Sequence, residues 1–126
     1  MIKNVIFGVR DMQRAIKYYD ATLGALGYQR TSTGEKFTGY GANGVTSFFI
    51  CTPRDGNPAT AGNGTQISVV APDTASVDKF HAAALANGGR DEGNPGYRPP
   101  DKKTSYGAYV RDPDGNKMMA VCPNPK

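Results

Sequence analysis

The sequence predicts an α+β fold: a single domain over residues 1–126, made of two tandem β-α-β-β-β modules. We expect the modules to form a cupped mixed sheet, with a helix packed outside each of them. Three observations predict this fold: an alternating strand that leads into an Asp-capped amphipathic helix, a second copy of that unit 62 residues later, and a closing β-hairpin. We place module one at about residues 1–54, a linker at about 54–63, and module two at about 64–126.

The first module begins with an alternating strand at residues 2–9, which has one fully apolar face. Asp11 is a suitable N-cap for a helix over residues 12–26, and Gly27 is a suitable residue to end it. The apolar stripe of this helix consists of Met12, Ala15, Ile16, Tyr19, Leu23 and Leu26. Three further strands are expected at residues 28–32, 36–40 and 45–52.

The second module repeats this order without a gap. Residues 65–71 alternate again, Asp73 caps a helix over residues 74–87, and Gly89 falls on Gly27. The predicted stripe of the second helix consists of Val77, Phe80, Ala84 and Leu85. A weak strand at 90–97 precedes a closing hairpin, whose strands at 106–110 and 117–122 flank the turn Asp-Pro-Asp-Gly-Asn.

Composition excludes several classes of partner. The chain is 38% hydrophobic, and no apolar run approaches the roughly 18 residues of a membrane span. It starts without the pattern of a signal peptide, so a cytoplasmic protein with free cysteines at Cys51 and Cys122 is expected. Its 15 basic residues are scattered, which disfavours nucleic acid, while the net charge of +4 gives a mild preference for anionic small molecules.

Several motifs identify a family resemblance. They are D-x-x-x-A-I-x-Y-Y-x-x-x-L-G from Asp11, A-P-D from Ala71 leading to Phe80-His81, and Y-V-R-D-P-D-G-N from Tyr109. Together they resemble the vicinal oxygen chelate superfamily, which includes glyoxalase I, bleomycin resistance proteins and extradiol dioxygenases. The resemblance covers nearly the whole chain and implies the two-module fold.

The resemblance also implies where a metal would be held. In metal-using members the ligands come from four strands, and three of those positions fall here on Asn4, Gln66 and Met119. The internal repeat places the fourth at Phe49. Divalent metals need converging imidazole, carboxylate or thiolate groups, and the single histidine, His81, falls inside the second helix. We therefore expect a member without the usual metal ligands, with no metal and no cofactor.

Those four positions predict a small-molecule pocket instead. Two amides and two apolar side chains suit apolar walls with a few orienting polar groups. Hairpin geometry places Tyr109 beside Met119, and Ser68 shares a strand face with Gln66. The candidate ligand-binding residues are Asn4, Phe49, Gln66, Ser68, Tyr109 and Met119. The alternative is that the two amides satisfy each other across a pseudo-twofold axis and that Met119 fills the core.

These residues favour a glyoxalase/bleomycin-resistance-like protein that binds or sequesters a small, partly aromatic compound without a metal. Bleomycin itself does not suit a basic chain. The first alternative is a metal-independent lyase- or isomerase-type enzyme, for which no catalytic residue is assigned; its candidate groups are Tyr40, Tyr97, Arg98, Tyr106 and Tyr109. A metal-dependent glyoxalase or dioxygenase is disfavoured by the missing ligands. The resemblance implies a homodimer, with the cup completed either within one chain or across the interface.

Overall fold

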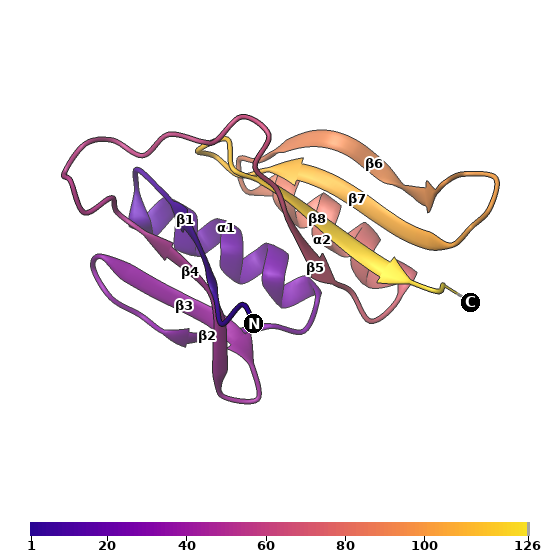
Figure 1. Cartoon of the computed structure of the whole chain (residues 1–126), viewed down its shortest axis with the longest axis horizontal. Coiled ribbons are helices and arrows are strands. Elements are labelled where there is room, and N and C mark those ends of the chain that lie inside the picture. Colours follow the sequence, from indigo (N-terminus) through magenta and orange to yellow (C-terminus); the bar gives the residue numbers. More distant parts are fainter. Residues whose placement is uncertain (126) are drawn as a thin grey trace.

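The computed structural model describes residues 1–125 and contains two four-stranded mixed sheets side by side (Figure 1). Helices α1 and α2 lie behind the sheets in this view and pack against each other. The first half consists of β1 (Val5–Gly8), α1 (Met12–Ala25), β2 (Gln29–Ser32), β3 (Phe37–Ala42) and β4 (Val45–Cys51). The second half consists of β5 (Ile67–Val70), α2 (Thr74–Ala86), β6 (Arg90–Arg98), β7 (Ser105–Arg111) and β8 (Lys117–Pro123). The α+β fold with tandem modules is confirmed.

The two sheets have equivalent topology, with strand orders β1-β4-β3-β2 and β5-β8-β7-β6. The first strand of each module pairs in parallel with the last, and the other pairings are antiparallel. Ile6 lies opposite Phe49 in the first sheet, and Ser68 lies opposite Met119 in the second. Since Ile6 and Ser68 are equivalent in the 62-residue repeat, Phe49 and Met119 occupy equivalent places.

Both helices start at the predicted aspartates. An Oδ of Asp11 accepts the N–H of Arg14 at 3.1 Å, and Asp73 accepts the N–H of Ser76 at 2.7 Å. The side-chain hydrogen bond with Ser76 lowers the pKa of Asp73. Gly27 follows α1 with a φ of +91°, a conformation that costs glycine little.

The core lies between the helices and the sheets. All six residues of the predicted first stripe are buried, which confirms it. Tyr18 and Thr22 are buried as well, because α1 packs against α2 in addition to its own sheet. In α2, the predicted position of Leu85 is wrong, since its side chain is 47% exposed. His81 is buried instead, and its Nε2 hydrogen-bonds Asp91 on β6 at 2.8 Å.

The first strand of each module is shorter than predicted. The parallel ladders begin at Val5 opposite Phe48 and at Ile67 opposite Met118. Asn4 and Gln66 therefore lie one residue before their strands rather than within them.

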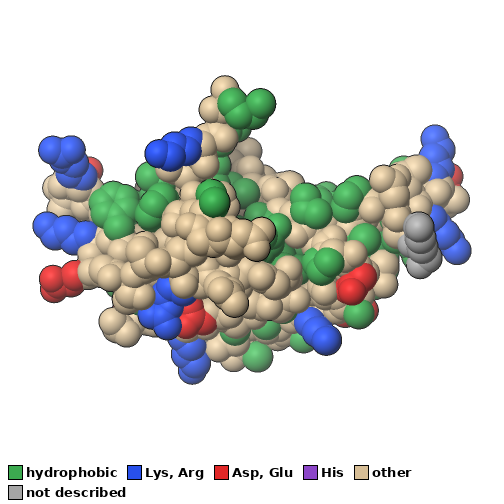
Figure 2. Space-filling model, turned by 90° about the horizontal axis from the view of Figure 1, so that it is seen from below, with side chains coloured by type: hydrophobic (Ala, Val, Ile, Leu, Met, Phe, Trp, Pro, Cys, Tyr) green, Lys and Arg blue, Asp and Glu red, His purple; other side chains and the backbone are tan. Residues whose placement is uncertain are grey.

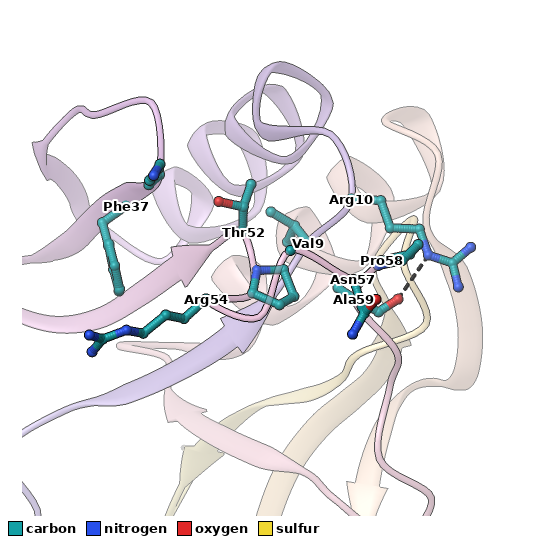
Figure 3. Close-up of a pocket in the computed structure, with 11 residues that line it drawn as sticks. Val9, Arg10, Phe37, Thr52, Arg54, Asn57, Pro58 and Ala59 are labelled. Carbon is teal, nitrogen blue, oxygen red and sulfur yellow. Dashed lines mark hydrogen bonds between the residues drawn. The ribbon is translucent and has the colours of Figure 1, made fainter.

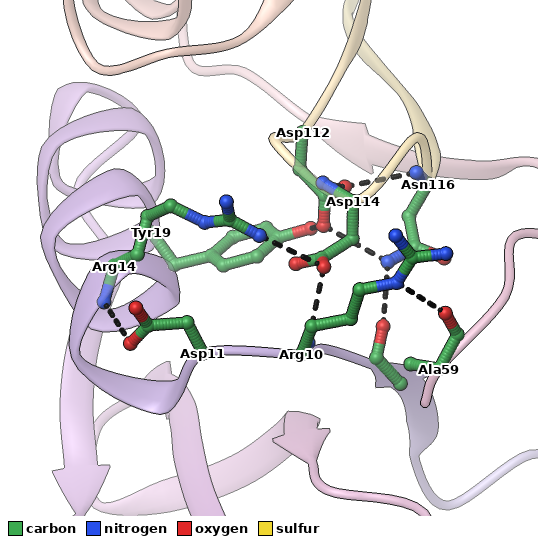
Figure 4. Close-up of polar contacts among 9 residues, drawn as sticks. Arg10, Asp11, Arg14, Tyr19, Ala59, Asp112, Asp114 and Asn116 are labelled. Atoms are coloured by element: carbon green, nitrogen blue, oxygen red, sulfur yellow. Dashed lines mark hydrogen bonds and ion pairs between the residues drawn. The ribbon is translucent and has the colours of Figure 1, made fainter. Parts of the chain in front are cut away.

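The Asp-Pro-Asp-Gly-Asn turn joins the two modules (Figure 4). Asp114 Oδ1 accepts the backbone N–H of Arg10 and a guanidinium N–H of Arg14, both at 3.0 Å. The side-chain amide of Asn116 donates to the carbonyl of Gly8 at 2.9 Å. These bonds link the closing hairpin to the start of module one, so we call Asp112, Asp114 and Asn116 the inter-module clamp.

Asp112 forms the buried part of this clamp. The hydroxyl of Tyr19 donates to its carboxylate at 2.6 Å, and the side-chain amide of Asn116 donates at 3.0 Å. Burial raises the pKa of Asp112, although these hydrogen bonds oppose the shift. The pKa of Tyr19 is raised well above its usual value, first by burial and then by the charge of Asp112.

Both cysteines are free, as expected; Cys122 is buried and Cys51 is half-buried. Within residues 1–125, neither helix has the length and apolar character needed to cross a membrane.

Candidate functional site

The candidate site lies on the sheet faces that point away from the helices. Phe48 and Ile50 are buried in the core, whereas Phe49 between them is only half-buried on the open face. Ile6 and Val70 on the same faces are 49% and 57% exposed. In Figure 2, hydrophobic side chains gather along the upper edge of the molecule, on both sides of a central projection.

Four of the six predicted residues form one contiguous group in the second sheet. Ser68, Met119 and Tyr109 lie in register across β5, β8 and β7. The amide of Gln66 donates to the hydroxyl of Ser68 at 3.2 Å, and that hydroxyl donates to the sulfur of Met119 at 3.8 Å. The group thus has a polar edge, a thioether centre and an aromatic ring at its far side.

The other two predicted residues belong to the first sheet. The ring of Phe49 packs edge-on against Phe37, with 6.1 Å between ring centroids. Asn4 is half-buried just before β1. Within residues 1–125 no hydrogen bond joins Asn4 to Gln66, because the Gln66 amide bonds Ser68 instead. The structure therefore lacks the first part of the alternative, two amides paired across a pseudo-twofold axis. Met119 is 8% exposed, which agrees with the second part, a Met119 that fills the core.

Glycines make room for these side chains, and the sequence reasoning missed them. A Cβ at Gly93 would lie 2.8 Å from the ring of Tyr109, and one at Gly107 would collide with the Met119 methyl group. A Cβ at Gly39 would lie 3.1 Å from the ring of Phe49. The signal that could have found Gly39 and Gly107 is a glycine in the third strand of both modules.

Two cations surround Tyr109. The guanidinium carbon of Arg98 lies 5.7 Å from the centroid of the Tyr109 ring, and Lys117 Nζ lies 5.2 Å from it. An Arg98 N–H also donates to the carbonyl of Asn94 at 2.6 Å, which fixes the guanidinium. Lys117 was missed, although it lies two residues before Met119 on the same strand face.

The remaining candidate acid/base tyrosines lie elsewhere; Tyr97 packs edge-on against Tyr106, with 5.1 Å between the ring centroids. Tyr40 is buried on the helix side of its sheet and donates to Asp20 at 2.9 Å. Tyr106 donates to Asp78 of α2 at 2.7 Å, and this hydrogen bond, with partial burial, raises the pKa of Tyr106 to about 12. Neither hydroxyl shares the open face with Tyr109.

Comparison with known proteins decides the family. The model of the Glyoxalase/Bleomycin resistance protein/Dioxygenase superfamily matches residues 2–119. The chain belongs to this superfamily. Among curated proteins, no sequence matches it.

Solved structures agree with this membership. A glyoxalase/bleomycin resistance protein from Albidiferax ferrireducens T118 is 41% identical, with a TM-score of 0.86 over 95% of this chain and 97% of that one. A glyoxalase-related enzyme from Fulvimarina pelagi shares the fold at 17% identity, with a TM-score of 0.74 over 97% and 87% of the two chains. A V278E mutant of glyoxalase I from Zea mays shares it at 20% identity and a TM-score of 0.69, over 94% of this chain and 44% of that one.

The donor set of this superfamily member does not fit a divalent metal. Within residues 1–125, no group of three or more His, Cys, Asp or Glu side chains could hold one. The four positions that the resemblance indicates carry two amides, a phenyl ring and a thioether, and hard cations take amides only as supplements to carboxylates. His81 is engaged with Asp91 between α2 and β6.

Proposed function

We propose that this superfamily member is a metal-free protein that binds or sequesters a small, partly aromatic compound on the open faces of its sheets. Its pocket would consist of Asn4, Phe49, Gln66, Ser68, Tyr109 and Met119. The observation that carries the proposal is the contiguous group of Gln66, Ser68, Met119 and Tyr109, where an apolar platform has hydrogen-bonding groups at one edge.

The chemistry of this group suits an aromatic ligand. Tyr109 and Phe49 offer rings for stacking, and the thioether of Met119 adapts to irregular shapes. The amide of Gln66 keeps a free carbonyl oxygen and a second N–H to orient polar substituents. Arg98 and Lys117 add positive charge beside Tyr109, which favours ligands with an anionic or electron-rich substituent.

The proposed ligand is bound rather than converted. Tyr40 and Tyr106, which the enzyme alternative would use, donate their hydroxyl protons to Asp20 and Asp78 on the helices rather than facing the group. We further propose that two chains form a homodimer that completes the pocket across its interface, because Ile6 and Val70 leave apolar surface uncovered on the open faces beside it. Light scattering at micromolar concentration should give twice the chain mass; a monomer would contradict the dimer.

A thermal-shift screen tests the pocket. Benzoate, benzyl alcohol, benzylamine and their two-ring analogues form the panel. Compounds that raise the Tm of the wild type are then tested on Met119→Glu, Gln66→Trp and the control Gln13→Glu, which adds the same charge on the exposed side of α1. We expect the shift to disappear in the two pocket variants and to persist in the control. Unchanged shifts in both pocket variants would exclude the open face as the site.

Two further measurements separate the alternatives. Elemental analysis of protein purified without chelator should find less than stoichiometric zinc, nickel, iron and manganese; a tightly bound equivalent would contradict the metal-free proposal. Nuclear magnetic resonance of a bound compound incubated with the protein should show it unchanged, and its conversion would favour the enzyme alternative.

A further inference from the structure

A cavity of about 790 Å³ lies at the end of the first sheet, where its lining residue Phe37 also packs against Phe49 of the proposed pocket (Figure 3). It lies between the linker that follows β4 and the beginning of β3, and it contains none of the six proposed pocket residues. We call it the linker cleft.

The linker cleft is lined by charges of one sign. Arg10, Lys36 and Arg54 contribute to its wall, and among the described residues that line it none is acidic. None of the three takes part in an ion pair within residues 1–125. The Nε of Arg10 donates to the carbonyl of Ala59 at 2.8 Å, which fixes its guanidinium group beside the linker. The residues that line the cleft therefore carry three positive charges and no negative one.

Two nearby carboxylates, those of Asp55 and Asp114, are engaged by other groups and lie outside the lining. Asp55 accepts the backbone N–H of Asn57 at 2.9 Å and is not part of the lining. Asp114 is held by Arg14 and by the backbone of Arg10. These contacts leave Lys36 and Arg54 as exposed cations at the rim of the cleft.

The cleft also has an apolar wall and neutral polar groups. Phe37 is 50% exposed at its edge, and Figure 3 shows the side chain of Arg54 extending towards it. Pro53 adds apolar surface, while the hydroxyl of Thr52 and the amide of Asn57 lie on the same lining. A cation beside an exposed ring suits a ligand with an anionic end and a flat apolar body.

We propose that the linker cleft is a second binding site, which takes small carboxylates or phosphates that carry an aromatic group. Arg54 and Lys36 pair with the anion, Phe37 packs against the apolar body, and Arg10 strengthens the field. The proposal rests on the cleft and its charges alone, so it stands whether or not the open-face pocket binds a ligand.

Phenyl phosphate is the probe. Inorganic phosphate supplies its anionic part alone, and benzyl alcohol supplies an aromatic ring without the charge. Titrated into ¹⁵N-labelled full chain, phenyl phosphate should give saturable shifts at the amides of Thr52, Gly56 and Asn57. Inorganic phosphate should bind the same amides more weakly, and benzyl alcohol should not saturate them. The phenyl phosphate affinity should fall as sodium chloride is raised. Shifts confined to Tyr109 and Met119 would overturn the proposal.

Two charge variants distinguish binding in the linker cleft from non-specific attraction of the anion to a basic protein. Arg54→Gln should weaken phenyl phosphate about tenfold, as expected for a lost charge-assisted hydrogen bond. Arg90→Gln makes the same charge change at the exposed start of β6 and should alter the affinity by less than about twofold. Equal losses in the two variants would overturn the proposal. If Arg54→Gln does not fold, Lys36→Gln takes its place.

Phe37→Ala tests the apolar wall independently. It should weaken phenyl phosphate while leaving inorganic phosphate unchanged, because only the ring contact is removed. Equal weakening of both probes by Phe37→Ala would contradict the assigned role of the ring.

Discussion

At the scale of single residues, Asp112 is a carboxylate held almost entirely by neutral donors. Its side chain accepts hydrogen bonds from Tyr19 and Asn116, and its Oδ1 also accepts the backbone N–H groups of Asp114 and Asn116 at 2.9 Å. The residue is 2% exposed. Both carboxylate oxygens of Asp112 accept hydrogen bonds. Replacing either oxygen by an NH₂ group would therefore place two donors face to face in a buried site.

Asp112→Asn should therefore lower the free energy of unfolding by about 2 to 3 kcal/mol, because its new NH₂ group faces a donor and leaves it unsatisfied. Urea denaturation gives the measurement. Asp101→Asn, in the exposed loop between β6 and β7, is the matched control and should change stability little. A variant as stable as this control would contradict the role of Asp112 in the clamp.

Asp91 predicts a pH dependence of stability. Its hydrogen bond with His81 lowers the pKa of this carboxyl below the usual 3.8, so folding favours the charged form. The stabilisation is present above the unfolded pKa and is lost as the pH falls from 3.8 through the lower folded pKa.

The wild type should accordingly be more stable than Asp91→Asn at about pH 5.5, and this difference should shrink as the pH is lowered below the unfolded pKa. Urea midpoints at a series of pH values measure it, with Asp101→Asn as the control. A difference that grows towards acid would show the opposite sign and refute the assignment.

At the scale of elements, local patterns predicted most of the fold. Each helix begins beside its capping aspartate because both cap and stripe are encoded within a few neighbouring residues. The pattern did not predict the burial of His81, because its partner Asp91 lies on β6, outside the helix. Leu85, one turn further along α2, is exposed instead. Local sequence thus determines where a helix lies, while distant strands select which of its residues are buried.

The same distinction holds for the site. Tyr109 beside Met119 could be predicted, because a short turn fixes the register of its hairpin. Arg98 beside Tyr109 could not, because the pairing of β6 with β7 shifts register on both sides of Gly93. A binding surface built from several strands depends on these irregularities, which period-two alternation does not reveal.

Two glycines should respond to alanine in opposite directions. A Cβ at Gly107 meets the Met119 methyl group and lies 2.9 Å from the Ala120 carbonyl oxygen, so Gly107→Ala should destabilise the protein by about 1 to 3 kcal/mol. Gly24 lies within α1 with nothing within 4 Å of the added carbon, so Gly24→Ala should stabilise by about 0.5 to 1 kcal/mol. Thermal melts of both variants check the prediction, and a stabilising Gly107→Ala would contradict the packing described.

At the scale of the whole molecule, the inter-module clamp and the packing of α1 on α2 hold the two halves together. The strands of the two halves belong to separate sheets. The relative position of the open faces therefore depends on contacts of the turn at residues 112–116 with the beginning of the chain.

A double-mutant cycle of Arg14→Ala and Asp114→Ala should give a coupling energy of about 1 kcal/mol, reduced from that of a buried pair because Arg14 is half exposed. The ion pair of Arg30 with Asp20 lies within module one and is exposed on both sides. Its cycle should give less than about 0.5 kcal/mol. Equal coupling energies in the two cycles would mean that the Arg14–Asp114 ion pair stabilises the contact between the modules no more than an exposed surface pair does.

The clamp also affects the order in which a newly made chain can finish folding. Arg10 precedes its partner Asp114 by 104 residues, and Gly8 precedes Asn116 by 108. At about 5 to 20 residues per second, a ribosome needs roughly 5 to 20 s to add the missing partners. For the first part of that interval, until α2 (Thr74–Ala86) has been made, Tyr18 and Thr22 on α1 lack the second helix that covers them in the finished protein. During synthesis, the face of α1 that carries Tyr18 and Thr22 is therefore exposed, and a nascent-chain chaperone would bind that surface.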